Sequence, residues 1–225
     1  MNGAAHLPPV IAIDGPSASG KGTVAQRVAQ ALGFHYLDSG ALYRLVAVAA
    51  RQSGVAWNDE AALAPIAANL DVRFEGDEIY LNQLVVTNTV RSEEASAGAS
   101  QVAVWPAVRT GLLRRQKAFR MAPGLVADGR DMGSVVFPDA SVKIFLTADA
   151  GTRAERRHKQ LIGKGMGANI TALLQDIRAR DERDSQRSAA PLQKTDDAIL
   201  LDTTHLSIDA AVEAVLGRYK AVTQL

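Results

Sequence analysis

A glycine-rich segment, GPSASGKGT from Gly15 to Thr23, has the residue types and spacing needed to hold phosphate groups. It directly follows the apolar run Val10 to Asp14 and directly precedes a helical pattern that begins at Lys21. Glycines let the backbone curl so that successive N–H groups face inward, and a helix N-terminus adds partial positive charge. The Lys can then reach the β and γ phosphates of a nucleoside triphosphate. A glycine-rich turn with a surface Lys is the alternative.

One position in this segment departs from the usual phosphate loop. The residue after Lys21, which is usually a Ser or Thr that binds Mg²⁺, is Gly22, and Thr23 comes one residue later. We therefore do not expect the loop itself to bind the metal directly. Asp128 ends the apolar run LVAD, and its carboxylate is placed to orient magnesium-bound water. A carboxylate that only caps its strand is the alternative.

Arginine accounts for 18 of the 25 basic residues. Phosphoryl transfer requires cations around the transferred oxygens, so arginines from separate segments should gather at one crevice. Ser39 and Arg44 follow the second apolar run, and Arg130 and Asp131 follow the third. Ligands bind beyond the carboxyl ends of parallel strands, which makes these residues candidates. A solvated helix residue for Arg44 and an ordinary Gly-Arg-Asp turn are the alternatives.

The stretch from Arg178 to Arg187 is almost entirely charged. Arg180, Arg183 and Arg187 recur at intervals of three and four, which places three guanidinium groups on one helical face. These groups repel one another unless an anion lies between them, and a triphosphate would supply that anion. We predict a mobile lid that closes over bound nucleotide. A solvated helix face with ion pairs four residues apart is the alternative.

The apolar runs and helical periodicity indicate an α/β fold in which strand and helix alternate. Between 58 and 100 the pattern changes: residues 71–76 and 78–83 alternate polar and apolar side chains around Asp77, which is typical of a sheet with one solvated face. A basic helix is expected from 101 to 120. We predict a five-stranded parallel sheet flanked by helices, with an inserted β-rich domain and a helical, Arg-rich lid. The predicted ranges are 1–57 core, 58–100 insert, 101–158 core, 159–190 lid and 191–225 core.

Composition excludes several classes of site. The 225 residues contain 47% hydrophobic side chains and no Cys, so disulfides, thiolate zinc sites and Cys nucleophiles are excluded. A net charge of +1 argues against a nucleic-acid partner. The first basic residue is Lys21 and the apolar stretches are short, so we expect a cytoplasmic protein without membrane contact. The histidines show no ligand spacing.

Four segments together resemble one family of enzymes. They are the loop ending in Gly-Lys-Gly-Thr, DSGALYR from Asp38 to Arg44, DGRDMG from Asp128 to Gly133, and RDERDSQR from Arg180 to Arg187. This combination is similar to the bacterial cytidylate (CMP) kinases, a nucleoside monophosphate kinase family, from about Val10 to Tyr219. The resemblance implies transfer of the γ-phosphoryl group of ATP, with Mg²⁺, to CMP or dCMP in pyrimidine nucleotide metabolism. It also implies the P-loop kinase fold and a monomer in which the insert enlarges the monophosphate-binding domain.

The resemblance assigns roles to individual residues. An Arg of the 149–163 helix stacks on adenine in such kinases; Arg153 and Arg157 both fit, as does a plain surface helix, and we assign Arg157. ATP binding is thus assigned to Gly15, Pro16, Ser17, Ala18, Ser19, Gly20, Lys21, Gly22, Thr23 and Arg157. CMP binding is assigned to Ser39, Arg44, Ser100, Arg109, Arg130, Asp131, Arg180, Asp184 and Arg187. Catalysis is assigned to Lys21, Arg130, Arg180, Arg183 and Arg187, and a water-mediated metal contact to Asp128.

Two other functions are the alternatives to this one. Another small-molecule kinase on the same core, such as a different nucleoside monophosphate kinase or shikimate kinase, is the nearest. A GTPase-type switch is the alternative from a different class. The chain contains no Asn-Lys-x-Asp sequence for reading guanine, and its loop threonine is displaced by one residue, so the sequence argues against the switch.

Overall fold

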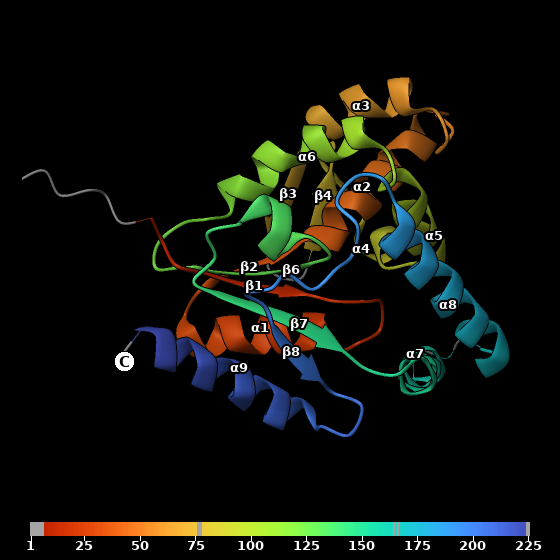
Figure 1. Ribbon diagram of the computed structural model, residues 1–225. Helices are drawn as coiled ribbons and strands as arrows, with labels where there is room; N and C mark the ends of the chain where they lie inside the picture. Colours follow the sequence, from red (N-terminus) through yellow and green to blue (C-terminus); the bar gives the residue numbers. More distant parts are fainter. Residues whose placement is uncertain (1–6, 76–77, 164, 166, 224–225) are drawn as a thin grey trace, which may run out of the picture. The chain divides into compact units, whose positions relative to one another are not determined.

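The computed structural model describes residues 7–75, 78–163, 165 and 167–223, and the chain divides into two compact units. The first unit comprises Met1–Leu37 and Phe119–Leu225, and the second comprises Asp38–Ala118. Figure 1 shows their elements along the chain.

The first unit is built on a five-stranded sheet in the order β2-β6-β1-β7-β8. Strand β1 (Val10–Asp14) pairs in parallel with β6 (Leu125–Gly129) on one side and β7 (Val142–Thr147) on the other. Strand β7 pairs in parallel with β8 (Ile199–Asp202), and β2 spans His35–Asp38. The predicted five-stranded parallel sheet is confirmed. Asp14 lies opposite Gly129 in the register, so the residues that follow β1 and β6 emerge at the same sheet edge.

Helices α1 (Lys21–Leu32) and α9 (Ile208–Thr223) cover one face of this sheet (Figure 1). Val24 and Val28 of α1 and Val215 of α9 are at most 2% exposed and pack with Ile13 and Leu146 of the strands. Burial of each such side chain contributes on the order of 1.5–3 kcal/mol. This apolar packing fixes where α1 begins, and therefore where the glycine-rich loop before it lies.

The remaining helices of the first unit follow β6 and β7. A short π-helix, η1 (Met132–Val136), begins three residues after β6 ends. Helix α7 (Ala150–Ile162) starts at Asp149, whose Oδ1 accepts a hydrogen bond of 2.8 Å from the Thr152 N–H. Helix α8 (Ile170–Gln186) starts at Asn169 and packs against α7. Both starts show the side-chain capping that the sequence pattern favours.

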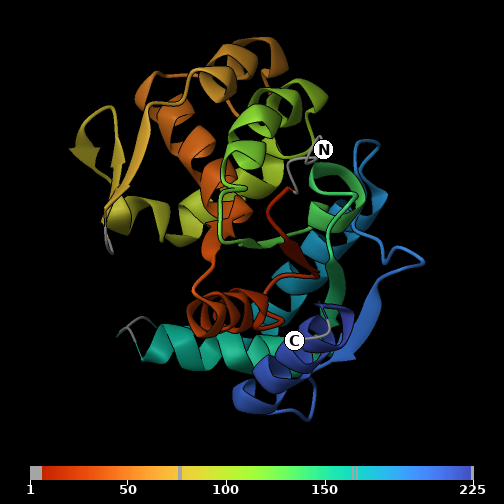
Figure 2. The same cartoon turned by 90° about the vertical axis from the view of Figure 1, so that its left-hand side faces the viewer.

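The second unit consists of helices and a small antiparallel sheet. Helix α2 (Ser39–Gln52) packs against α5 (Glu93–Val102), and α3 (Glu60–Ala68) packs against α6 (Pro106–Ala118). Strands β3 (Val72–Glu75), β4 (Glu78–Leu81) and β5 (Leu84–Val85) form the sheet, drawn in yellow in Figure 2, and α4 (Thr87–Val90) follows it.

Two details of this unit differ from the sequence analysis. The 58–100 segment contains the expected sheet, but α3, α4 and α5 also lie in it; α3 and α5 have the alanine-rich sequences EAALAPIAA and EEASAGASQV, and Ala is the strongest helix former. The helix expected from 101 begins at Pro106 and ends at Ala118, because Pro fits the first helical position but interrupts a helix that continues through it. Asp77 lies outside the described residues. Within those residues, no helix has the length and apolar character needed to span a bilayer.

Candidate active site

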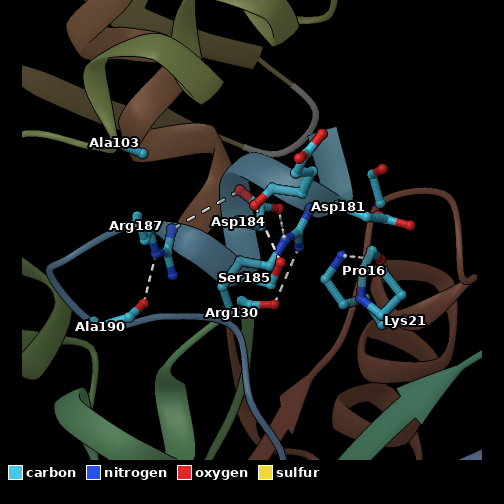
Figure 3. Close-up of polar contacts among 12 residues, drawn as sticks. Pro16, Lys21, Ala103, Arg130, Asp181, Asp184, Ser185, Arg187 and Ala190 are labelled. Atoms are coloured by element: carbon cyan, nitrogen blue, oxygen red, sulfur yellow. Dashed lines mark hydrogen bonds and ion pairs between the residues drawn. The ribbon is translucent and has the colours of Figure 1, made fainter. Parts of the chain in front are cut away.

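The glycine-rich loop packs tightly against the sheet. A Cβ on Gly15 would lie 2.0 Å from the carbonyl oxygen of Leu146 in β7, so only glycine fits there. The Nζ of Lys21 donates to the Pro16 carbonyl at 3.3 Å (Figure 3). Two other loop carbonyls, of Ser17 and Ser19, accept hydrogen bonds from Arg153 and Arg156 of α7 at 3.2 and 3.1 Å. The loop is therefore a fixed structure rather than an open turn.

The unusual Gly22 has a neighbour that accounts for it. A Cβ at this position would lie 3.1 Å from Oδ2 of Asp128, at the end of β6, and 3.6 Å from the Tyr36 hydroxyl. That hydroxyl donates to the same Oδ2 at 2.8 Å. Asp128 is 5% exposed. A buried carboxylate thus lies beside the first turn of α1, where the hydroxyl of the usual Ser or Thr would be.

Arg130, Asp184 and Arg187 form a charged cluster in the first unit (Figure 3). The Nε of Arg130 donates to Oδ2 of Asp184 at 2.8 Å, and the Arg187 Nη1 lies 4.0 Å from the other carboxylate oxygen. Arg187 is further held by its Nε, which donates to the Ala190 carbonyl at 2.6 Å. The side chains of Arg187 and Asp184 are only 3% and 8% exposed. The cluster joins the segment after β6 to the end of α8.

Within this cluster, opposite charges favour the ionised forms of Asp184 and Arg130 more strongly than burial disfavours them. Burial alone would raise the pKa of Asp184, but Arg130, Arg180 and Arg187 hold that pKa below its ordinary value. Burial likewise opposes the charge of Arg130, and Asp184 raises the Arg130 pKa above its ordinary value. The sequence predicts a triphosphate as the anion between Arg180, Arg183 and Arg187. In the structure Asp184, on the same helix, is an anion that interacts with Arg180 and Arg187.

Asp14 has a role that the sequence analysis did not assign. It is the last residue of β1, and its two carboxylate oxygens accept hydrogen bonds of 2.8 Å from the backbone N–H groups of Met132 and Gly133. Burial raises the pKa of Asp14 to about 7 despite these bonds, with a further contribution from Asp131. Asp14 therefore connects the segment that carries Arg130 and Asp131 to the start of the glycine-rich loop. A carboxylate immediately before that loop is a signal that the sequence does contain.

Arg153 and Arg157, the two arginines of α7 that fit adenine by sequence, have different surroundings in the structure. The Arg153 side chain is 6% exposed and donates both Nη groups to the carboxylate of Asp181 in α8, at 3.0 and 2.5 Å. Arg157 is half-buried, and its Nη1 donates to Gln160 on the same helix at 2.5 Å. Arg153 is therefore part of the packing of α7 on α8, and the assignment of Arg157 to adenine stays a prediction.

Four of the assigned residues lie in the second unit. Ser39 and Ser100 are buried at the start of α2 and within α5. Arg109 of α6 lies with its guanidinium carbon 5.6 Å from the centroid of the Tyr43 ring, and its Nη1 donates to the Ala103 carbonyl at 3.2 Å. Arg44 is half-buried, and its Nε has no hydrogen-bond partner within the described residues. The ring and the carbonyl orient Arg109, a support that sequence reasoning missed.

The other assigned residues lie in the first unit. Asp131 is 3% exposed and precedes η1, while Arg183 of α8 is exposed. Among the residues that the structure describes, no group of three or more His, Cys, Asp or Glu side chains could hold a metal ion.

Known proteins resemble this chain over most of its length. The cytidylate kinase family model matches residues 11–221. Cytidylate kinase of Chromobacterium violaceum is 61% identical over 208 residues, covering 92% of this chain and 94% of that protein. Cytidylate kinase of Pseudomonas aeruginosa is 59% identical over 222 residues and covers 96% of each. A gluconokinase structure from Sinorhizobium meliloti 1021 aligns with a TM-score of 0.51 at 15% identity, over 97% of this chain and 95% of that one, which shows a shared fold.

Proposed function

Because this chain belongs to the cytidylate kinase family, we propose that it transfers the γ-phosphoryl group of ATP to CMP or dCMP, giving ADP and CDP or dCDP. It is a phosphotransferase of nucleotide metabolism. The observation that carries the proposal is the sheet edge of the first unit. There the glycine-rich loop follows β1, and the Arg130 segment follows the neighbouring strand β6. Asp14 accepts hydrogen bonds from the Met132 and Gly133 N–H groups of that segment. Ligands of parallel sheets bind at such an edge.

The loop from Gly15 to Thr23 holds the ATP phosphates in this proposal. Its N–H groups and the N-terminus of α1 attract the anionic oxygens, and Lys21 follows the transferred phosphoryl group from its present position beside Pro16. Arg157 contacts the adenine. The nucleophile is the phosphate of CMP, which is already ionised at neutral pH, so no side chain is required to remove a proton.

The arginines neutralise charge as the phosphoryl group moves. Arg130, Arg180, Arg183 and Arg187 act on the transferred group, because cations placed around its oxygens lower the barrier of a step in which positioning dominates. CMP binding is assigned to Ser39, Arg44, Ser100, Arg109, Arg130, Asp131, Arg180, Asp184 and Arg187. Within the first unit, the ion pair between Arg130 and Asp184 keeps the Arg130 guanidinium charged and oriented.

The residues beside the loop fit a magnesium ion that arrives with ATP. Asp128 is a buried carboxylate next to Gly22, which suits a hydrogen bond to metal-bound water. When bound, Mg²⁺ supplies positive charge to the β and γ phosphates. Asp128 orients that water, and the hydroxyl of Tyr36 orients Asp128. The monomeric state, the lack of a nucleic-acid partner, the cytoplasmic location and the domain boundaries at 58, 100, 159 and 190 stay predictions.

A coupled assay tests this function. ADP formation is measured with ATP and each of CMP, dCMP, UMP, AMP and shikimate as acceptor. We expect the highest kcat/KM with CMP or dCMP. A preference for AMP or shikimate would overturn the proposal in favour of another small-molecule kinase on the same core.

A further inference from the structure

Arg153 bonds three segments at once. It lies near the start of α7, yet its side chain is only 6% exposed, which is rare for arginine unless every donor is paired. Its Nε donates to the Ala148 carbonyl at 2.9 Å, before α7. Its Nη1 donates to the Ser17 carbonyl of the glycine-rich loop, and both Nη groups bond Asp181 of α8. A single guanidinium group therefore connects the strand end, the loop and α8.

The hydrogen bond from Arg153 to the Ser17 carbonyl fixes the orientation of the peptide unit between Ser17 and Ala18. A peptide unit is planar and trans, so the carbonyl of one residue and the N–H of the next point in opposite directions. When Arg153 holds the Ser17 carbonyl on the α7 side, the Ala18 N–H must point to the other side of the loop. Arg156 and Thr203 fix the orientation of the next peptide unit but one, between Ser19 and Gly20. Both donate hydrogen bonds to the Ser19 carbonyl, at 3.1 and 3.2 Å.

The bond to Asp181 fixes the position of α8. Asp181 follows Arg180 directly and lies one turn before Asp184, whose carboxylate pairs with Arg130 (Figure 3). Two acidic residues three positions apart thus hold α8 to two arginines of other segments. The charged face of α8 cannot rotate or slide without breaking the contact to Arg153. The positions of Arg180 and Arg183 relative to the loop consequently depend on that contact.

We propose that Arg153 is a positioning residue that couples the glycine-rich loop to α8 through its bonds to Ser17 and Asp181. The consequence for phosphoryl transfer rests on the proposed function: one guanidinium aligns the N–H groups that receive ATP with the helix that carries Arg180 and Arg183. Lysine cannot replace it, because a single ammonium group cannot bond both oxygens of Asp181 and two carbonyls in fixed directions.

The direct test substitutes Asp181 in α8 and measures the effect on the backbone of Ala18 in the glycine-rich loop. The backbone order parameter of Ala18 is measured by NMR relaxation in the nucleotide-free protein with Asp181→Asn. We expect it to fall from about 0.85, typical of rigid backbone, to below about 0.6, because loss of the charged partner releases Arg153 from the loop. Asp181→Glu should return it to near the wild-type value. Glu182→Gln removes a charge from the neighbouring exposed position on the same helix and should leave it unchanged.

Kinetics supply the second readout. We expect kcat/KM for ATP to fall about tenfold with Asp181→Asn and with Arg153→Lys, because small misplacements of the reacting groups are costly. The double variant should fall no more than about threefold below either single variant, since both substitutions break one interaction. Asp181 is 30% exposed, so its variants keep the test valid if Arg153→Lys does not fold.

Three results would overturn the proposal: an Ala18 order parameter in Asp181→Asn equal to that of wild type, multiplication of the two kinetic effects, or an equal effect of Glu182→Gln. The relaxation experiment contains no nucleotide and no reaction. Its failure is therefore distinguishable from failure of the proposed function, which would appear as a wild-type protein that does not phosphorylate CMP.

Discussion

Lys21 is the single side chain on which the phosphate-loop assignment depends most. It is half-buried at the first position of α1, where its ammonium group donates to the Pro16 carbonyl. A charged contact that strengthens in the transition state lowers the barrier, so its loss should reduce kcat rather than only weaken substrate binding.

We therefore expect Lys21→Met to lower kcat by about a hundredfold or more, as loss of a transition-state contact does, with an unchanged unfolding free energy within about 0.5 kcal/mol. Steady-state kinetics and urea unfolding check both. Arg27→Ala, which removes a cation from the exposed face of the same helix, is the control and should retain wild-type kcat. A Lys21→Met variant with near-normal turnover would remove the phosphate-loop assignment.

Asp14 should make the stability of the fold depend on pH. Burial raises its folded pKa to about 7 from 3.8, so the folded protein holds this proton where the unfolded chain has lost it. The stabilisation is full below the unfolded pKa and is lost as pH rises towards the folded pKa. Asp131 adds to the elevation and Arg130 opposes it.

The expected result is an unfolding free energy that decreases between about pH 4 and pH 7 with a slope of up to about 1.4 kcal/mol per pH unit from this group. Asp14→Asn should remove that part of the slope, whatever its effect on absolute stability. Urea unfolding across this pH range measures both proteins. If the unfolding free energies of wild type and Asp14→Asn changed in parallel with pH, the pKa of Asp14 would not be raised in the folded protein.

Helix α8 is the element whose motion the sequence predicts. Its charged face is held by Asp181 and Asp184 to arginines of the first unit, and most of its other residues are exposed. Closure over bound nucleotide would exclude water from the transferred phosphoryl group and protect ATP from hydrolysis.

We expect amide exchange in α8 to be fast in the free protein and at least about tenfold slower with a bisubstrate analogue that joins the two nucleotides, because ordering of a helix by ligand suppresses its local opening. Exchange mass spectrometry over 170–186 measures it, with α9 as an internal reference. Equal protection in both states would indicate a static solvated helix.

Local patterns predicted the elements of the first unit well. The apolar run Val10–Asp14, the helix from Lys21 and its end at Gly33 all depend on residues adjacent in sequence, and the structure has them at those positions. The second unit was predicted less well, because its alternating strands and alanine-rich helices occupy one stretch and the alternation was the only periodicity used.

Contacts between distant residues account for what the sequence could not predict. Asp14 bonds residues 118 and 119 positions away, and Arg153 bonds a carbonyl 136 positions away. Nothing in the spacing of Asp181 or Asp184 distinguishes a carboxylate bound to an arginine from one on a solvated helix. The site residues that follow strands were predictable, whereas the residues that hold them in place were not.

At the scale of the whole molecule, the residues assigned to CMP are distributed over both units. Arg109 is held by Tyr43 and Ala103 in the second, and Asp131 is buried before η1 in the first. The chemistry of each suits cytosine. Cytosine offers an amino donor at position 4 and an acceptor at N3, whereas uracil offers a carbonyl acceptor and an N–H donor. A carboxylate only accepts and a guanidinium only donates.

Substitution in either unit should therefore weaken the choice of base. Uracil would place acceptors against Asp131 and donors against Arg109, and a good paired contact discriminates by about 1–3 kcal/mol. We expect Asp131→Ala and Arg109→Leu each to narrow the ratio of kcat/KM for CMP over UMP by about tenfold, with most of the loss on CMP. Arg114→Leu, at an exposed position of the same helix as Arg109, should leave the ratio unchanged.

If Asp131→Ala lowers kcat/KM for CMP and for UMP by the same factor, Asp131 positions the substrate or its own loop and does not read the base. If only one of the two substitutions narrows the ratio, base recognition belongs to the unit that carries that residue.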